Sequence, residues 1–308
     1  MRKMVSRRSL LTTAAGGLLA HGATQIPAHA CDCHTHIFGD PRQFPFSPHR
    51  RYTPRPALPE EMAALHRELH MERVVIVTPS VYGTDNSATL YGLKARGPSA
   101  RGVAVIDDKT SNRELDAMAK AGIRGIRLNL ATAGIDNSAT SRQLFHAAAT
   151  RMAERGWHIQ MFTSLGVIAA IKDLVLASPV PVVFDHFGGA EAARGLHQPG
   201  FADLLELLKS GKAYAKLSGA YRVSQWAPDY PDAAPLARAL IAANRDRIVW
   251  GTDWPHPDSA PPSGNAMVAT PFLQIGDARL LQELIQWSGD EVTLRKILVE
   301  NPARLYKF

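Results

Sequence analysis

The chain has 308 residues, of which 45% are hydrophobic and 20% charged, and these values exclude a disordered or fibrous protein. The net charge is +7, but Arg2, Lys3, Arg7 and Arg8 contribute +4 before the first acidic residue, which leaves +3 on residues 31–308. So small a charge gives little support to nucleic-acid binding. The composition indicates an ordinary globular protein with a large core, and we expect no nucleic-acid partner.

The N-terminal segment has the pattern of an export signal. The twin-arginine run Ser6-Arg7-Arg8-Ser9-Leu10-Leu11 is followed by a weakly apolar stretch, residues 10–20, and by the small-residue end Ala28-His29-Ala30. The apolar stretch is too short to span a bilayer, so we expect no stable membrane insertion. The pattern predicts a signal over residues 1–30, export by the twin-arginine translocase and a periplasmic location. The alternative is a disordered basic tail with a chance arginine pair.

Short β-rich runs recur along the rest of the chain, and most are separated by amphipathic helical stretches. Strands are predicted at residues 32–38, 73–79, 102–106, 125–130, 157–162, 180–186, 213–219 and 248–253. Helices are predicted at residues 59–70, 112–121, 141–155, 165–177, 201–210, 233–244 and 278–288, while residues 83–97 are ambiguous.

Eight strands that alternate with helices predict a parallel sheet that closes into a (β/α)₈ TIM barrel, as a single domain over residues 31–308. An open doubly wound sheet is the alternative, but no glycine-rich phosphate loop begins a helix. Two proline-rich loops, residues 38–59 and 255–271, follow the first and last strands. Both are expected to cover the barrel mouth.

The first strand begins with Cys31-Asp32-Cys33-His34-Thr35-His36. Alternate residues of a strand share a face, so Asp32, His34 and His36 are expected to project one way, toward the mouth. Asp253, at the end of the last strand, can meet the two imidazoles there. This pattern predicts a hydrolytic site or a metal site. The two cysteines, at i and i+2 of one strand, are poorly placed for a disulfide and are expected to pack behind the strand as small apolar residues.

Polar residues end almost every predicted strand on the mouth side. They are His34 and His36, Thr78 and Ser80, Arg127 and Asn129, Gln160, Asp185 and His186, Lys216 and Ser218, and Asp253. Barrel interiors are filled by apolar residues, so polar residues at successive strand ends favour a functional site. For any one of them, a loop hydrogen bond is the alternative.

Several ordered motifs resemble the amidohydrolase superfamily. They are Asp32-Cys33-His34-Thr35-His36-Ile37-Phe38-Gly39, Arg124-Gly125-Ile126-Arg127-Leu128-Asn129, Phe184-Asp185-His186-Phe187-Gly188-Gly189, Lys216-Leu217-Ser218-Gly219-Ala220-Tyr221-Arg222, Trp250-Gly251-Thr252-Asp253-Trp254-Pro255-His256-Pro257 and Asn301-Pro302-Ala303-Arg304-Leu305-Tyr306. The resemblance covers essentially all of residues 31–308. Within the superfamily the motifs are similar to those of the branch that contains 2-pyrone-4,6-dicarboxylate lactonase and sulfomuconolactone hydrolase.

The resemblance implies ring opening of a small carboxylated lactone by water. Asp253 would act as general base, and His34, His36 and His186 would polarise the carbonyl group and stabilise the oxyanion. The residues expected to bind the substrate are Arg127, Arg222, Tyr52, Thr78, Ser80 and Gln160. The guanidinium groups suit a carboxylate because each donates two parallel hydrogen bonds.

Two strand ends depart from the metal-dependent members of the superfamily. Those proteins usually have a lysine on the fourth strand or a histidine at the end of the fifth, where this chain has Leu128/Asn129 and Gln160/Met161. His158 lies too early in its strand to replace the ligand. His34, His36 and Asp253 still amount to the three ligands of a catalytic zinc site. We expect no required cofactor, and one divalent metal on these three residues, zinc above all, is the alternative.

A second difference from the family pattern bears on the substrate class. The pyrone-dicarboxylate lactonases of this branch have a further basic residue a few positions after the one that Arg127 resembles, and this chain reads Ala131-Thr132-Ala133-Gly134 there. A lactone with one carboxylate, or a sugar-derived or sulfonated lactone, is therefore expected rather than the pyrone dicarboxylate. Two other functions stay open: a zinc-dependent amidohydrolase or decarboxylase of a small carboxylic acid, and a binding protein without catalysis.

Overall fold

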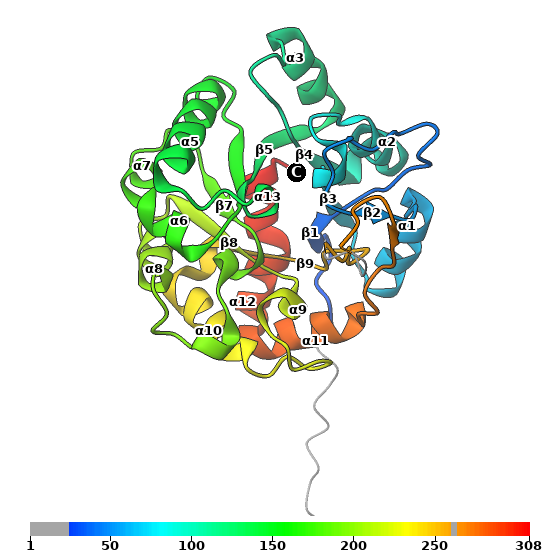
Figure 1. Ribbon diagram of the computed structural model, residues 1–308. Helices are drawn as coiled ribbons and strands as arrows, with labels where there is room; N and C mark the ends of the chain where they lie inside the picture. The colour runs from blue at the N-terminus through cyan, green and yellow to red at the C-terminus, as the bar shows by residue number, and fades with distance from the viewer. Residues whose placement is uncertain (1–24, 260–263) are drawn as a thin grey trace, which may run out of the picture.

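The computed structural model describes residues 25–259 and 264–308. Eight parallel strands form one sheet in the order β1-β3-β4-β5-β6-β7-β8-β9 (Figure 1). Their bounds are β1 Cys31–Thr35, β3 Arg73–Val77, β4 Ala100–Ala104, β5 Ile123–Asn129, β6 His158–Phe162, β7 Val182–Phe184, β8 Ala213–Ser218 and β9 Ile248–Gly251. The first and last strands meet through backbone hydrogen bonds from His36 to Trp254 and from Asp253 to His34, both 2.9 Å. The sheet is thus a closed barrel, and the predicted (β/α)₈ fold is confirmed.

Helices surround the barrel, and six of the seven predicted helices are present with small differences at their ends. The long helices are α1 Pro59–Glu68, α2 Ser87–Arg96, α3 Asn112–Ala121, α5 Ser138–Met152, α8 Phe201–Lys209, α10 Ala233–Asn244 and α11 Asp277–Ser288. The short helices are α4 Leu130–Ala133, α6 Leu165–Ala170, α7 Lys172–Leu176, α9 Ala220–Val223, α12 Glu291–Arg295 and α13 Asn301–Tyr306. The ambiguous stretch contains α2, and the single helix predicted at 165–177 is divided between α6 and α7.

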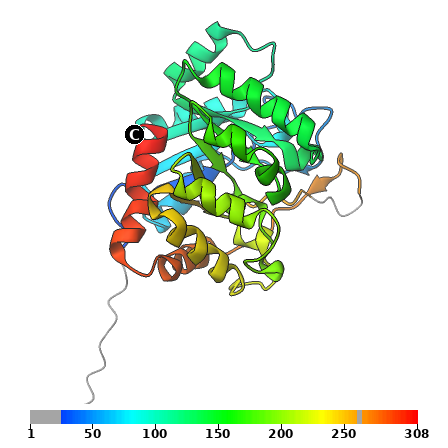
Figure 2. The same ribbon diagram turned by 90° about the vertical axis from the view of Figure 1, so that its left-hand side faces the viewer.

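The end of the barrel opposite the mouth is filled by apolar side chains. One buried cluster consists of Cys31, Cys33, Val75, Val77, Val103, Val183, Tyr214 and Val249 from the strands, with Leu305 and Tyr306 from the C-terminal end. Figure 2 shows α13 at this end, far from the loop that contains β10, Ala269–Thr270. Cys31 and Cys33 are buried and free, as expected. They pack inside the barrel, however, and not behind the strand.

The expectation that Asp32 shares a face with His34 and His36 is wrong. The β1–β3 ladder is irregular between Asp32 and Thr35, and such a bulge breaks the alternation of faces. The Asp32 carboxylate accepts hydrogen bonds from the Thr252 backbone N–H at 3.0 Å and the Thr252 hydroxyl at 2.6 Å, and it lies 3.3 Å from His66 of α1. Asp32 therefore fastens β1 to the last strand and to α1, while His34 and His36 enter the mouth.

As expected, residues of the two proline-rich loops line the pocket at the mouth, and the two loops are also joined to each other. Strand β2, Thr53–Pro54, pairs in parallel with β10. The ring of Phe38, in the first loop, stacks on the ring of Phe272, directly after the second loop, with centroids 5.8 Å apart. These contacts fix the first loop, which contains Tyr52, against the loop that follows Asp253.

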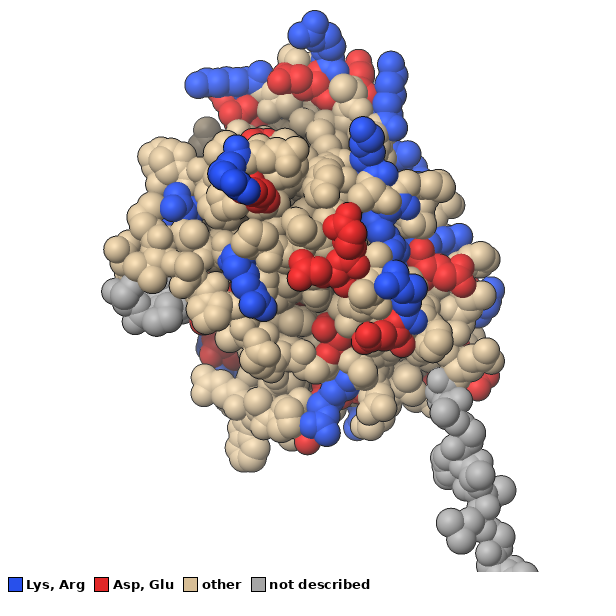
Figure 3. Space-filling model, turned by 90° about the vertical axis from the view of Figure 1, so that its right-hand side faces the viewer, with Lys and Arg blue, Asp and Glu red and all other residues tan. Residues whose placement is uncertain are grey.

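The outer surface gives no sign of a membrane-spanning element in the described chain, because none of its helices is both long and apolar enough to cross a bilayer. Figure 3 shows acidic and basic side chains interspersed over the face of the molecule that lies on the right in Figure 1. Such mixing does not favour a polyanionic partner on this face.

Candidate active site

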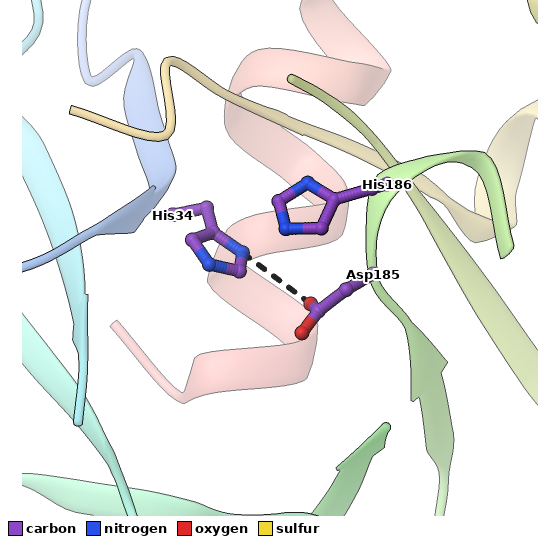
Figure 4. Close-up of side chains that lie close together, drawn as sticks. All are labelled: His34, Asp185 and His186. Atoms are coloured by element: carbon purple, nitrogen blue, oxygen red, sulfur yellow. Dashed lines mark ion pairs between the residues drawn. The ribbon is translucent and has the colours of Figure 1, made fainter. Parts of the chain in front are cut away.

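The barrel brings the polar strand ends together at its mouth. His34 and His36 come from β1, Asp185 and His186 from the turn after β7, and Asp253 from the turn after β9, and each has at most 4% of its surface exposed. The imidazoles of His34 and His186 have centroids 4.8 Å apart. Figure 4 shows these two rings beside Asp185, whose carboxylate lies 3.3 Å from His34 Nδ1. The four predicted catalytic residues thus form one buried cluster.

Backbone geometry at the last strand aims Asp253 into this cluster. Gly251 lies so close to β1 that a Cβ there would be 2.5 Å from the backbone nitrogen of His34. Asp253 has a φ of 67° and His186 a φ of 47°, which are left-handed values uncommon for residues other than glycine. Such conformations are strained and persist only where the surrounding fold enforces them, and they are found most often at functional sites.

The Asp253 carboxylate has one engaged and one open oxygen. Oδ2 accepts hydrogen bonds from the Tyr221 hydroxyl at 2.7 Å and from Arg222 Nε at 2.6 Å. Oδ1 lies 3.4 Å from His36 Nε2 and 3.6 Å from His34 Nε2, and it accepts no hydrogen bond among the described residues. Burial opposes ionisation, but Arg222 and the three surrounding histidines together outweigh it and hold the pKa of Asp253 well below its usual range. Asp253 is therefore an anion at neutral pH.

The hydrogen-bond partners of His36 and His186 bear on which ring nitrogen of each carries the proton. His36 Nδ1 lies 2.8 Å from the Val77 carbonyl oxygen, which can only accept, so this nitrogen is the donor. In neutral His36 the lone pair is then on Nε2, facing Asp253 Oδ1. His186 Nδ1 contacts the carbonyl and hydroxyl oxygens of Ser218 at 3.2 and 2.9 Å. Burial lowers the pKa of His186 to about 4, so this imidazole is neutral at pH 7.

A layer of buried charge lies beneath the imidazoles. The Lys216 ammonium contacts His34 Nδ1 at 3.2 Å, Gln160 Oε1 at 2.8 Å and Asp185 Oδ1 at 3.4 Å. Asp185 Oδ2 also accepts from Arg127 Nε at 3.0 Å and from Gln160 at 3.1 Å. Burial raises the pKa of Asp185, but Lys216 and the other cationic neighbours outweigh it and the net shift is well below the usual range. The layer is therefore an ion-paired floor under the site.

A small pocket opens above the cluster. Its lining consists of His36, Tyr52, Pro79, Ser80, Arg127, Thr132, Phe162, His186, Arg222, Asp253, Pro257 and Ser259. Four predicted substrate-binding residues, Tyr52, Ser80, Arg127 and Arg222, are in this lining. Thr78 is not: it is fully buried and bonds to Asn86 and Thr89. Gln160 lies in the charged floor instead.

A second cavity of about 350 Å³ continues from this pocket, with which it shares Ser80 and Thr132. His49, Arg50 and Arg51 of the first loop line it, together with Thr132 and Ala133. No carboxylate residue is among its lining residues. The stretch that lacks a basic residue after Arg127 therefore faces two arginines from another loop.

Sequence reasoning named Lys216 and Asp185 only as polar strand ends, and it gave Tyr221 no role. The ion pair of Lys216 with Asp185 joins residues of different strands. Tyr221 directly precedes Arg222 in a short helix, α9, and both donate to the same carboxylate oxygen. The position of Tyr221 next to Arg222 in the sequence could have indicated that Tyr221 belongs to the site. The contact of Lys216 with His34 has no such local pattern in the sequence.

Among the residues that the structure describes, two groups bring potential metal ligands within 4.8 Å of one another: His34, His36 and Asp253, and His34, Asp185 and His186. Both groups need His34. An ammonium can only donate hydrogen bonds, so the contact with Lys216 requires His34 Nδ1 to accept. The proton of neutral His34 is then on Nε2, the nitrogen that faces His36 and Asp253. Burial lowers the pKa of His34, so protonation of both nitrogens is disfavoured. The positions suit a divalent ion, but this protonation state does not.

Comparison with known proteins shows the family of the chain. The sequence profile of the amidohydrolase family, Amidohydro_2, matches residues 31–308. The chain is 33% identical over 295 residues to a 2-pyrone-4,6-dicarboxylate hydrolase of Comamonas testosteroni, covering 92% of this chain and 91% of the relative. It is 33% identical over 281 residues to a 4-sulfomuconolactone hydrolase of Rhizobium radiobacter, covering 91% of each.

A solved structure shows the same architecture. An apo protein from Agrobacterium tumefaciens superposes with a TM-score of 0.77 at 27% identity, covering 92% of this chain and 98% of the other. Fold and site thus define a (β/α)₈ barrel with a polar site at the carboxyl ends of its strands, which is where barrel enzymes place their active sites. Within that class, the chain belongs to the amidohydrolase family.

Proposed function

We propose that this protein is a hydrolase that opens the ring of a small acidic lactone by attack of water. The observation that carries the proposal is the open oxygen of Asp253, which is buried, ionised and turned toward the Nε2 atoms of His34 and His36. A general base must lie within hydrogen-bond reach of the proton that it removes. The names of the two hydrolase relatives, both of which act on lactones, support the same reaction class.

Two acceptors can hold the attacking water. Asp253 Oδ1 and the lone pair of neutral His36 Nε2 are 3.4 Å apart, and both face the same space. A water molecule with one hydrogen directed at each would turn a lone pair toward the substrate. Asp253 then takes one proton as the water oxygen bonds to the lactone carbonyl carbon. The ring carbon–oxygen bond breaks in the next step, and Asp253 returns the proton to the departing ring oxygen.

The developing oxyanion needs donors near the carbonyl oxygen. His34 supplies an Nε2–H at the centre of the cluster, because Lys216 occupies its other nitrogen. His186 adjoins it, with ring centroids 4.8 Å apart, and neutral His186 can donate from Nε2 when its Nδ1 accepts from the Ser218 hydroxyl at 2.9 Å. Donors fixed in a buried site stabilise a transition-state charge without reorganising, and removal of one such donor typically costs about 10²–10³ in kcat. The cluster thus provides both a base and an oxyanion site.

An acidic group on the substrate would be held by Arg127 and Arg222, with Tyr52 and Ser80 beside them in the pocket lining. Both guanidinium groups are paired with carboxylates, Arg127 with Asp185 and Arg222 with Asp253. A substrate carboxylate that competes for Arg222 would make Asp253 more basic as the lactone binds. Arg50 and Arg51 in the adjoining cavity add positive charge, which favours an anionic lactone.

We further propose that the hydrolase works in the periplasm after export by the twin-arginine translocase, without a required metal. The twin arginines lie outside the described residues. Ala30, at the end of the proposed signal, is fully buried, and its carbonyl accepts backbone hydrogen bonds from Glu72 and Arg73. The folded unit therefore starts at or before Ala30.

A monocarboxylated, sugar-derived or sulfonated lactone is the proposed substrate.

The proposal is tested by assaying purified protein against a panel of lactones with and without a chelator. The panel contains pyrone dicarboxylate, sulfonated and sugar-derived acidic lactones, and the methyl ester of each acid. We expect turnover of at least one acidic lactone, weaker turnover of its ester and no loss on chelation. Activity on neutral amides alone, or complete loss with chelator that zinc restores, would favour the zinc-dependent amidohydrolase instead.

A further inference from the structure

Lys216 is a fully buried lysine in the middle of the barrel. Its ammonium forms hydrogen bonds with His34 Nδ1 at 3.2 Å and Gln160 Oε1 at 2.8 Å, and it lies 3.4 Å from Asp185 Oδ1. An ammonium group has three N–H donors, of which two are used by His34 and Gln160, and the contact with Asp185 Oδ1 is an ion pair. A buried charge of this kind is stable only when it is paired, and Asp185 is the paired anion.

His34 has two neighbours that compete for Nδ1. Asp185 Oδ1 lies 3.3 Å from it, nearly as close as the ammonium, but this oxygen accepts no hydrogen bond among the described residues. Lys216 is the residue that forms the hydrogen bond. Since Lys216 donates, Nδ1 must be unprotonated, and the single proton of neutral His34 must be on Nε2.

We propose that Lys216 is a positioning residue that fixes the proton of His34 on Nε2 and thereby prevents His34, His36 and Asp253 from binding a divalent metal. One part of the inference, that the Nε2 proton of His34 binds the oxyanion, rests on the proposed function. The tautomer and the metal exclusion concern the protein alone. They can be measured without a substrate.

The residues around His34 show how a metal site could form if Lys216 were absent. Without the ammonium, His34 Nδ1 can carry the proton and donate it to Asp185 Oδ1. Nε2 then has a free lone pair beside His36 Nε2 and Asp253 Oδ1, which gives three ligands with an open fourth position. His36 Nδ1 already donates to the Val77 carbonyl, and a metal-binding histidine typically donates its other N–H to a carbonyl or carboxylate. Only the protonation of His34 is unsuited to a metal.

The first test is nitrogen NMR of the wild-type protein labelled in its histidines, at neutral pH and free of metal. The His34 signals are assigned by their loss in the variant His34→Asn. We expect the coupling pattern of an imidazole protonated at Nε2. A pattern with the proton on Nδ1 would overturn the proposal whatever the variants of Lys216 do.

The second test measures zinc binding by calorimetry and by elemental analysis after desalting. Lys216→Met removes the ammonium and keeps an unbranched side chain, and we expect it to retain about one zinc ion per chain where the wild type retains almost none. The exposed Lys212→Met is the matched control and should behave as wild type. The double variant Lys216→Met, His34→Asn should lose the gained zinc, which identifies His34 as a ligand.

Two results would contradict the second test's expectation. Stoichiometric zinc in the wild type, lost in His34→Asn, would show that Lys216 does not exclude the metal. A folded Lys216→Met protein that binds no zinc would also show that Lys216 is not the residue that prevents metal binding. If Lys216→Met does not fold, Lys216→Gln replaces it, and the wild-type NMR pattern remains decisive. Failure of the lactonase assay with the expected tautomer and zinc results would leave this inference intact.

Discussion

Arg222 Nε donates to Asp253 Oδ2 at 2.6 Å, so the proposed general base is paired with an arginine that the sequence assigned to the substrate. The pairing turns the second carboxylate oxygen toward the histidines. It also makes the ionised form of Asp253 the stable one, so the base is available at any pH near neutrality. The carboxylate of a bound lactone would meet the same guanidinium group. Binding and base strength are thereby coupled through one residue.

Asp253→Asn should abolish turnover while the fold remains intact. The amide cannot take a proton from water, so kcat should fall by about 10²-fold or more. Its oxygen can still accept from Tyr221 and Arg222, which limits structural damage. Steady-state kinetics with a thermal melt as folding check makes the measurement. The control is Asp173→Asn, which removes only a surface pair with Arg142. Turnover close to wild type in Asp253→Asn would contradict the mechanism.

Arg127→Met should separate binding of the acid from chemistry. Loss of a charge-assisted contact costs on the order of 1.5–3 kcal/mol, so KM for the acid should rise roughly tenfold to more than a hundredfold with little change in kcat. Asp185 keeps Lys216 as a partner in the variant. The methyl ester of the acid should show almost no difference between wild type and variant. Equal impairment of acid and ester would mean that Arg127 serves the structure or the chemistry instead.

Stability should fall as the pH is lowered from 7 to 4. Burial, opposed by Asp253, lowers the pKa of His186 from 6.5 to about 4. The unfolded chain therefore takes up a proton below pH 6.5 that the folded protein binds only near pH 4, so His186 contributes stability above pH 6.5 that is lost through this interval. The loss is about 3 kcal/mol. Denaturant unfolding across this range should show a shallower pH dependence for His186→Asn, with the exposed His146→Asn as control. Identical slopes for wild type and His186→Asn would refute the assignment.

Replacement of Arg7 and Arg8 by lysine should leave the protein in the cytoplasm. In the export proposal the arginine pair acts as the signal that the translocase reads, so activity in the total extract should be unchanged. Fractionation followed by immunoblotting gives the distribution. The matched control replaces Arg2 by lysine. Equal periplasmic yield from wild type and the double variant would overturn the export proposal.

The fold could be predicted because its signals are local. Apolar alternation and helical spacing repeat in every βα unit, and eight such units specify a closed barrel. The failure at Asp32 has a physical cause. The register of β1 against β3 shifts between Asp32 and Thr35, and the residues of β1 alone do not reveal such a shift in pairing with another strand.

The site could be predicted in part for a related reason. Parallel strands deliver their carboxyl ends to one mouth, so position alone predicts that His34, His36, His186 and Asp253 meet there, whereas their proposed roles depend on the family resemblance. The hydrogen bond of Lys216 with His34 joins residues 182 positions apart. It depends on the barrel diameter and on side-chain length across the interior, neither of which a local pattern contains. For the same reason, the pairing of Arg127 with Asp185 became visible only in three dimensions.

The most direct test of the central claim, attack of water on an acidic lactone with Asp253 as base, is the mass of the product formed in water enriched in the heavy oxygen isotope. The account predicts that each product molecule gains one heavy oxygen, located in the newly formed carboxylate, and that Asp253→Asn forms almost no labelled product. A product that the wild type forms without the label would show that the ring rearranges without water, and it would contradict the account.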